Sequence, residues 1–460
     1  MRPGVSVGIR RVAHIEDGRN LAIRRAAIVG AGPAGVIAFA ALRYRGLSSA
    51  DVAVYDDRPA LSAWTERTEA IRQTEMRSES DGHMFPTDYP GFALLDSLRS
   101  RTLMPLIRSA VNRYHPSRQD IQRHGLAIAE HYELSASLEA ARVDRLTFAS
   151  DPEPHAVLLD MSGDVVGRAR HVLLSVGHGR LRWPDALSDP GAREQFGDVV
   201  CHAYQPKSYA DRVYLVVGSG MAAAAEWTNI LEAGGRVISL RRNPEVVVQP
   251  LSAPRCYFGG PLLDRFHQLD RMERASLLRR TARGSYPSSS GREHLLEAAI
   301  EDGRMERRVG TLTDLTQRDG ALEATIEGPG GDGRCRIDVV IAATGFQSGW
   351  TAHPVLRDLL STFGVETDGE FAVLNDDCTV PLPANIGATV TLSGPAARWV
   401  FPPADSFAGM KYVARRFANT VFGTRAGLAP GPVAWWRLVR AGTPGRSAPM
   451  ETESAICASP

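Results

Sequence analysis

At 460 residues the chain is long for one domain, and this length predicts two or three domains with sizeable hydrophobic cores. Its 53 Lys and Arg residues balance 52 Asp and Glu residues, and the net charge of +1 argues against a nucleic-acid or anionic-membrane partner. An apolar fraction of 43% and a charged fraction of 23% are typical of a soluble globular protein.

The cysteines are scattered along the chain, and no pair has CxxC or CxxxxC spacing. This pattern argues against a disulfide framework, a zinc site or other metal site, and a redox-active dithiol. We therefore expect reduced thiols in a cytoplasmic protein. The five residues are Cys201, Cys256, Cys335, Cys378 and Cys457.

A dinucleotide fingerprint opens the ordered part of the chain. Arg25–Val29 predicts a buried parallel strand, and GAGPAG at residues 30–35 predicts a GxGxxG turn into a helix over Val36–Tyr44. A second short strand, Asp51–Tyr55, is followed by Asp56, at the spacing where an acid hydrogen-bonds a ribose hydroxyl. Strand, glycines, helix and acid together indicate a nucleotide site.

The next segments are less regular. Arg58–Phe92 is polar and contains Pro86, Pro90, Gly82 and Gly91, which predict a structured loop. Apolar spacing then predicts two helices and several strands. These are helices at Leu98–Tyr114 and Arg118–His124, strand pieces within Leu138–Asp160, and a buried strand at Ala169–Gly177.

A second dinucleotide fingerprint follows, with the sequence GSGMAA. Arg212–Val217 predicts a strand, residues 218–223 form GxGxxA, and a helix is expected over Ala222–Ala233. The following strand, Arg236–Leu240, ends in Arg241 and Arg242 instead of an acid. Because Arg at this position accommodates a 2′-phosphate, the second nucleotide is expected to be NADP(H); a solvated basic pair is the alternative.

The remaining patterns predict a helix at Met272–Thr281, a hairpin of Glu323–Glu327 with Arg334–Ile337, a buried strand in Asp338–Gly345, and a helix following the prolines of Phe401–Phe417. The expected fold is α/β, with two Rossmann-like dinucleotide-binding domains, the NADP domain inserted in the FAD domain, and small β-meander segments. The expected divisions are a disordered arm at 1–24, FAD-binding segments at 25–211 and 338–423, an NADPH-binding domain at 212–337, and a flexible tail at 424–460.

Two complete fingerprints imply two dinucleotides that exchange something, and hydride transfer from NADPH to a flavin is the economical interpretation. GAGPAG, SVG at 175–177, GSGMAA and AATG at 342–345 together resemble the two-domain FAD/NADPH flavoproteins. Within these, Ala26–Ala418 is similar to the single-component monooxygenases: flavin-containing and Baeyer-Villiger monooxygenases and the N-hydroxylases of ornithine and lysine. The resemblance implies FAD and NADPH as cofactors, and O₂ and a small molecule as substrates.

Three stretches carry the likeness to monooxygenases: SDGHMFPTDYPGF at 80–92, VVCHAY at 199–204 and RRNPEVVVQP at 241–250. The first resembles a flavin-face loop, which makes Gln73, Met76 and Arg77 candidates for the flavin face. The third resembles a segment of the N-hydroxylases in which a substrate-contacting Asn follows a Val. Here Gln249 follows Val248, so Gln249 is the candidate on the substrate side.

The subgroup patterns are incomplete. Phe196 and His202 keep the Baeyer-Villiger spacing, but Gly197 comes one place early and Gln205–Pro206 replaces the aromatic-Pro pair. His83 and His202 are candidates for acid-base or positioning roles. Lys207 is either an additional contact to the NADP phosphate or a solvated lysine.

The resemblance implies oxygenation of a small nucleophile through a flavin C4a-hydroperoxide, with amine N-hydroxylation first. Sulfide or Baeyer-Villiger oxygenation, a flavin dehydrogenase or reductase, and a non-catalytic nucleotide-sensing module are the alternatives. No nucleic-acid or membrane partner is expected, and an oligomer is possible. The expected cofactor-binding residues are Gly30, Gly32, Pro33, Ala34, Gly35, Asp56, Val143, Gly177, Gly218, Ser219, Gly220, Met221, Ala223, Arg241, Arg242, Thr344 and Gly345.

Overall fold

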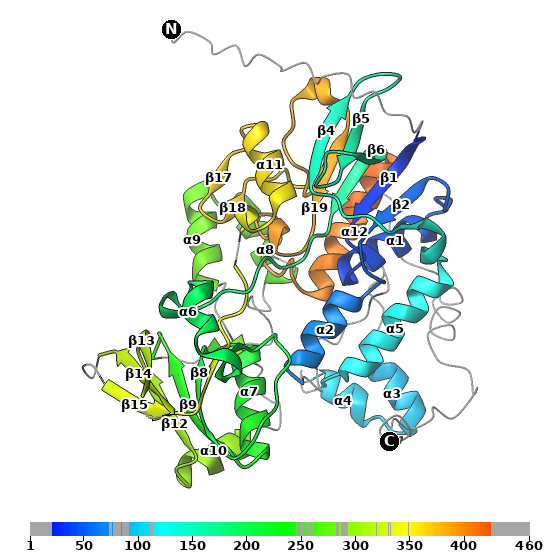
Figure 1. Cartoon of the computed structure of the whole chain (residues 1–460). Helices are drawn as coiled ribbons and strands as arrows, with labels where there is room; N and C mark the ends of the chain where they lie inside the picture. The colour runs from blue at the N-terminus through cyan, green and yellow to red at the C-terminus, as the bar shows by residue number, and fades with distance from the viewer. Residues whose placement is uncertain are drawn as a thin grey trace, which may run out of the picture.

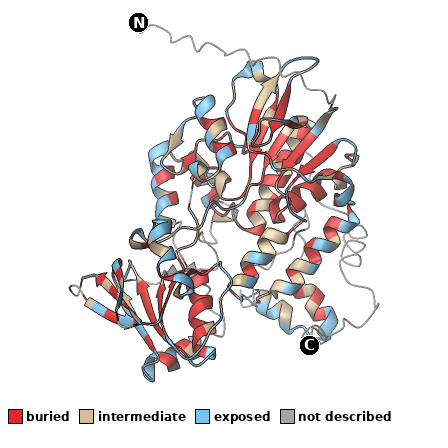
Figure 2. Cartoon of the chain, in the orientation of Figure 1, coloured by how far each residue is buried: buried red, intermediate tan, exposed pale blue. Residues whose placement is uncertain are grey.

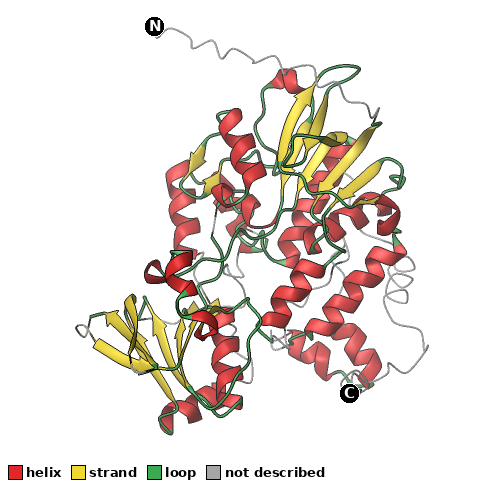
Figure 3. Ribbon diagram, in the orientation of Figure 1, coloured by secondary structure: helices red, strands yellow, loops and turns green. Residues whose placement is uncertain are grey.

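Two separate groups of strands organise the molecule (Figures 1 and 3). The computed structural model describes residues 21–72, 76, 84, 92–110, 114–244, 247–248, 253, 257–259, 261–281, 285–286, 293–318, 320–329, 331, 333–347 and 349–424. Most of the expected arm and tail therefore lies outside the described residues.

The first fingerprint strand, β1 (Ile23–Val29), lies inside a seven-stranded sheet of order β3-β2-β1-β6-β5-β4, with β19 also paired to β6. It pairs in parallel with β2 and β6, and its last four residues are buried. Because β1 begins at Ile23, the last two residues of the expected arm belong to the sheet. The other strands are β2 (Val52–Tyr55), β3 (Leu138–Glu139), β4 (Arg145–Ala149), β5 (His155–Leu159), β6 (Val165–Leu174) and β19 (Thr389–Leu392).

Two helices pack together against this sheet, α1 (Pro33–Tyr44) and α12 (Phe407–Phe422). Ten of the twelve α1 residues are buried, which explains its small and apolar side chains. Pro at the first helical position favours a start at Pro33, earlier than the expected Val36.

A group of helices beside the first sheet differs from the expectation. The segment predicted as a loop contains α2 (Ser62–Ala70). The helix expected over Leu98–Tyr114 is interrupted at Arg101, whose φ is +53°, because that left-handed conformation cannot continue a helix. The helices here are α3 (Phe92–Ser100), α4 (Met104–Ala110) and α5 (Arg118–His131).

The second sheet is parallel throughout and has the order β12-β9-β8-β16-β7. It extends beyond the expected 212–337 segment in both directions, because β7 and β16 pair with each other and β16 pairs with the fingerprint strand β8. Helices α7 (Met221–Glu232) and α10 (Glu293–Glu301) contact its strands, and the short helix α6 (Pro190–Glu194) precedes β7 in the chain. The strands are β7 (Val200–His202), β8 (Val213–Val217), β9 (Arg236–Arg241), β12 (Met305–Val309) and β16 (Val339–Ala342).

The expected hairpin is confirmed by β14 (Ala321–Glu327) and β15 (Gly333–Ile337), and a third antiparallel strand, β13 (Thr311–Arg318), completes that sheet. The helix expected at Met272–Thr281 is α9 (Arg271–Thr281). The remaining elements are α8 (Pro261–Gln268), α11 (Pro354–Thr362) and the short pairs β10 (Val247–Val248) with β11 (Ser285–Tyr286) and β17 (Thr367–Asp368) with β18 (Phe371–Ala372).

Buried residues gather around each sheet (Figure 2). One large hydrophobic cluster surrounds β1, α1 and α12, and two others cover the faces of the second sheet. The chain therefore forms two units, called here the first and second units after their sheets. Across the described residues, no helix combines the length and apolar character needed to span a membrane.

Candidate functional site

The first glycine turn has the geometry that its sequence predicts. Gly30 adopts a φ of +101°, and a Cβ there would lie 2.5 Å from the carbonyl oxygen of Ser175. A Cβ on Gly35 would lie 1.9 Å from the carbonyl oxygen of Gly30, so this glycine permits close packing of the helix. A Cβ on Gly32 would meet no protein atom within 4 Å, so this position faces open space.

The second turn repeats this construction. Gly218 adopts a φ of +141°, and a Cβ there would lie 2.3 Å from the carbonyl oxygen of Ala343. Its amide donates to the carbonyl of Leu240 at 2.8 Å, as the Gly30 amide donates to Tyr55 at 2.8 Å. In both turns the chain passes from a parallel strand into a helix whose first amides are available to an anion.

Both turns open on one cavity of about 980 Å³, a size suited to sizeable organic ligands. The cavity is lined by residues of both units, including strand ends that are far apart in the sequence. The expected residues on its wall are Gly30, Gly32, Pro33, Ala34, Asp56, Met76, Gly177, Gly218, Ser219, Gly220, Met221, Arg241, Arg242, Thr344 and Gly345.

Three expected residues lie elsewhere. Gly35 and Ala223 pack inside the starts of α1 and α7, and neither lines the cavity. Val143 is 6% exposed in the core of the first unit, away from the cavity wall. Four of the candidates lie outside the described residues: Gln73, Arg77, His83 and Gln249. Of the candidates for the flavin face and the substrate side, the structure therefore places only Met76, which lines the cavity.

The acid of the first unit is held in place by backbone donors. The Asp56 carboxylate accepts from the Ala31 amide at 2.8 Å and from the Arg58 amide at 3.0 Å, using different oxygens. Each carboxylate oxygen has a second lone pair, so Asp56 can still accept from a hydroxyl in the cavity. In the second unit, Arg241 ends β9, and it and Arg242 bring positive charge to the cavity wall.

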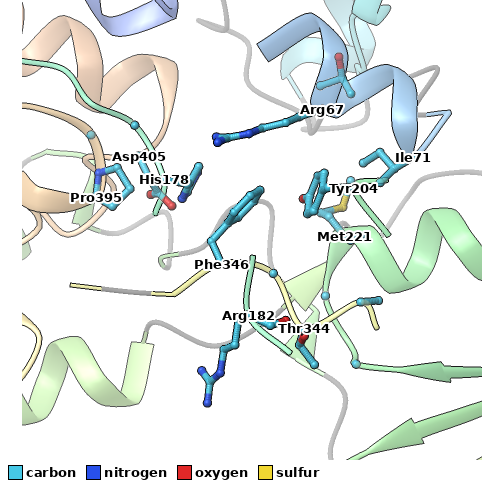
Figure 4. A pocket seen from close by; sticks show the side chains of 18 of the residues that line it. Arg67, Ile71, His178, Arg182, Tyr204, Met221, Thr344, Phe346, Pro395 and Asp405 are labelled. Atoms are coloured by element: carbon cyan, nitrogen blue, oxygen red, sulfur yellow. Dashed lines mark hydrogen bonds between the residues drawn. The ribbon is translucent and has the colours of Figure 1, made fainter. Parts of the chain in front are cut away.

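An aromatic and cationic wall lies between the two turns (Figure 4). The Arg67 guanidinium carbon lies 4.7 Å from the centroid of the Phe346 ring, and Figure 4 shows the end of the side chain directed toward His178. The His178 ring stacks on Phe346 at 4.9 Å, and the Tyr204 ring lies 4.6 Å from Phe346.

The protein around the cavity sets the protonation of this wall. His178 is exposed to the cavity, and desolvation by the neighbouring protein lowers its pKa to about 4, so the imidazole is neutral at pH 7. Burial also lowers the pKa of Arg67, which remains protonated because its ordinary value is so high. Within the part of the chain that the structure describes, Arg67 forms no ion pair or hydrogen bond, and its charge faces the cavity.

The start of α12 and the residue before it line a further part of the cavity, and Figure 4 shows Asp405 close to His178. The helix is capped by Ser406, whose hydroxyl accepts from the Gly409 amide at 3.0 Å. Asp405, just before it, pairs with Arg398 at 2.6 Å, so the charges of these two lining residues largely compensate each other.

His202 has a structural position. It is fully buried, its Nε2 lies 3.0 Å from the carbonyl oxygen of Arg182, and the Tyr204 amide donates to its Nδ1. Desolvation lowers its pKa to about 4. This geometry matches the positioning role considered for it, since it joins β7 to the segment that follows β6.

Within the described ranges, no group of three or more His, Cys, Asp or Glu side chains is arranged to hold a metal ion. Cys201, Cys335 and Cys378 are buried free thiols, and burial raises the pKa of each.

Sequence reasoning missed Arg67, His178, Phe346 and Asp405. His178 and Phe346 directly follow Gly177 and Gly345, so the residue after each strand-end glycine could have been singled out. Arg67 lies on α2, within a segment predicted as a loop, and no motif marks it. Asp405 becomes noticeable only when α12 is placed against the first sheet.

Comparison with known proteins supports the fold. The sequence matches no protein-family model and no curated protein. The structure is similar to ornithine hydroxylase from Pseudomonas aeruginosa, with a TM-score of 0.67 and 14% identity over 87% of this chain and 99% of that chain. It is also similar to an ornithine N-hydroxylase from Kutzneria sp. 744, whose structure contains reduced FAD, NADP⁺ and L-ornithine (TM-score 0.65, 16% identity), and to L-lysine 6-monooxygenase from Pseudomonas syringae (0.65, 17%).

Each of these two matches also covers 87% of this chain and 99% of the other. The expected α/β fold with two Rossmann-like units is therefore confirmed, and this chain has the two-domain fold found in the flavoprotein N-hydroxylases.

Proposed function

We propose that this protein is an FAD- and NADPH-dependent monooxygenase that hydroxylates a primary amine. The observation that carries this proposal is that two fingerprints, one followed by an acid and one by two arginines, open on one cavity. The similarity in fold to proteins named as ornithine and lysine hydroxylases supports the choice of an amine substrate.

The residues present fit the two dinucleotides. The open space beside Gly32 admits a pyrophosphate close to the backbone, and Asp56 can accept from a ribose hydroxyl. The Gly218–Met221 turn would hold the second pyrophosphate, with Arg241 and Arg242 at its 2′-phosphate. We assign FAD to the first unit and NADPH to the second, with β7 and β16 included in the second unit.

When bound, the cofactors would supply hydride from NADPH and oxygen activation at the flavin. The balanced reaction consumes one amine, one O₂, one NADPH and one proton, and yields one hydroxylamine, one water and one NADP⁺. The protein must enclose the reacting groups and exclude bulk water, and Phe346, Tyr204 and Met221 provide an apolar wall for this purpose.

The substrate nitrogen must be unprotonated to act as a nucleophile. The charge of Arg67 at the same wall disfavours an ammonium group nearby and so lowers the pKa of a bound amine. Neutral His178 adds no second positive charge and can accept a hydrogen bond through a ring nitrogen.

The purified protein should be tested for FAD content and then with NADPH, O₂ and a panel of amines beginning with L-ornithine and L-lysine. We expect equal amounts of NADPH and O₂ to be consumed, with one ¹⁸O atom from ¹⁸O₂ in a hydroxylamine product. NADPH oxidation without a hydroxylated amine would contradict the proposal. An oxygenated sulfide or ketone would then favour one of the alternative oxygenations, and the lack of any oxygenated product would favour electron transfer to another acceptor.

A further inference from the structure

The end of helix α2 in the first unit is inserted into the second unit. Ile71, which follows α2, is 2% exposed and belongs to the hydrophobic cluster of α7 and the second sheet. The other buried members of that cluster lie between Cys201 and Ala343. The contact therefore joins the two units through a side chain that also lines the cavity.

Lys207 makes the next part of this contact. Its ammonium donates to the carbonyl of Ala70 at 3.2 Å, to the carbonyl of Ala203 at 2.5 Å and to Glu226 of α7 at 3.1 Å. All three ammonium protons thus have an acceptor, and one acceptor is at the C-terminal end of α2, where a cation is favourable. Lys207 does not line the cavity, so neither expectation for it, a phosphate contact or a solvated lysine, holds.

Glu226 and Asn229 extend the contact along α7. The Glu226 carboxylate, which is 0% exposed, accepts from the Tyr209 hydroxyl at 2.9 Å. Burial raises the pKa of this carboxyl, while Lys207 and Tyr209 favour its charged form. The Asn229 amide donates to the carbonyl of Ile71 at 3.0 Å, directly after the carbonyl that Lys207 contacts.

Such a network is costly if it serves only stability. A buried ion pair loses its hydration on both sides, and well-packed apolar residues are often as stable. Water could equally satisfy the terminal carbonyls of α2 at an exposed helix end. The Lys207–Glu226 pair and the Asn229 amide instead fix how α2 and α7 lie relative to each other. They bind two consecutive carbonyls, that of Ala70 at the end of α2 and that of Ile71 directly after it.

The two joined helices form adjacent parts of the cavity wall. Helix α2 and the residue after it contribute Arg67, Thr68 and Ile71, and the start of α7 contributes Met221 and Ala222. Figure 4 shows Ile71, Tyr204 and Met221 grouped on one side of Phe346. A shift of α7 relative to α2 would therefore move the second glycine turn relative to the wall that carries Arg67.

We propose that Lys207, Glu226 and Asn229 are positioning residues that hold the second nucleotide turn at a fixed distance from the first unit and so set the geometry of hydride transfer. This inference rests on the proposed function for its catalytic consequence. The network itself consists of contacts between the units and can be tested without turnover.

Asn229→Ala and Asn229→Asp both remove the donor to Ile71, and Glu232→Ala, at an exposed position on the same helix, is the matched control. In anaerobic stopped-flow reduction we expect the two Asn229 variants to keep their FAD and their Kd for NADPH within a few-fold. Their limiting rate of flavin reduction should fall by about tenfold to a hundredfold, because small misplacements of reacting groups have effects of that size. The control should behave as the wild type.

Hydrogen exchange of the peptide covering residues 62–72 gives a readout independent of activity. We expect faster exchange there in both Asn229 variants and in Ile71→Ala, which weakens the same contact from the other side. An unchanged reduction rate, or a slower reduction without faster exchange, would overturn the inference. If the wild type is not reduced by NADPH, the proposed function fails, while the exchange measurement still decides whether these residues join the units.

Discussion

Arg67 and Phe346 meet across the two units of the molecule, with the guanidinium carbon 4.7 Å from the ring centroid. Arg67 comes from α2 beside the first sheet, and Phe346 follows β16 of the second sheet. Their contact places a positive charge and an aromatic face together on the wall of the cavity that both fingerprints share. A substrate bound at this wall would lie close to both the positive charge of Arg67 and the ring of Phe346.

Replacing Arg67 by Met should change the pH dependence of turnover. Without the nearby positive charge the pKa of a bound amine rises, so the pH at which kcat reaches half its maximum should increase by about one unit. The pH profile of kcat measures this. Arg67→Lys keeps the charge and should stay near the wild-type profile; equal shifts in both variants would show that charge is not the cause.

Replacing Gly32 by Ala should remove FAD without unfolding the protein. The added Cβ meets no protein atom within 4 Å, so thermal stability of the FAD-free protein should be unchanged, whereas the methyl group occupies the space needed by a pyrophosphate. Flavin absorbance of the purified protein and its Tm together test this. Gly35→Ala is the contrasting variant, because its Cβ would lie 1.9 Å from a backbone oxygen and should prevent folding. Normal FAD content in Gly32→Ala would refute the first site.

Replacing Arg241 and Arg242 together by Ala should impair NADPH much more than NADH. Charge-assisted hydrogen bonds to the 2′-phosphate are worth about 1.5–3 kcal/mol each, so the KM for NADPH should rise at least about tenfold. The ratio of kcat/KM for the two cofactors measures the effect. A loss of equal size for NADPH and NADH would indicate that the arginines support β9 and do not select the cofactor.

The sequence allowed the central parts of the fold and site to be predicted, because they depend on local geometry. Gly30, Gly218 and the strands before them follow a spacing that only a tight strand-to-helix turn explains, and the structure contains both turns. No motif shows that both turns open on one cavity. This was expected only because two bound dinucleotides that react with each other must lie close together.

Other features depend on contacts between distant segments and had no local signal. β16 was expected in the first unit, but its hydrogen bonds to β8 and β7 place it in the second sheet, and strand pairing is not visible in a four-residue apolar run. Lys207 has an ordinary linker context, and only the fold shows that three acceptors surround its ammonium. Arg67 was missed because the polar composition of α2 hides its helix.

Acid should destabilise the protein partly through His202. Its pKa is lowered to about 4 in the folded chain, against an ordinary value of 6.5, so the unfolded chain binds a proton first as the pH falls. Stability from this group is complete above pH 6.5 and decreases down to pH 4, and the difference of 2.5 units corresponds to roughly 3 kcal/mol. The pH dependence of the urea midpoint, followed from pH 7 to pH 4, measures the loss.

His202→Gln keeps a hydrogen-bonding side chain but cannot take up this proton, so its midpoint should depend less steeply on pH than that of the wild type. The other buried histidines titrate in both proteins and therefore cancel in the comparison. His294→Gln is the control, since the side chain of His294 is 95% exposed. If His202→Gln and His294→Gln lose stability in parallel with the wild type between pH 6.5 and 4, then His202 is not held neutral by its burial.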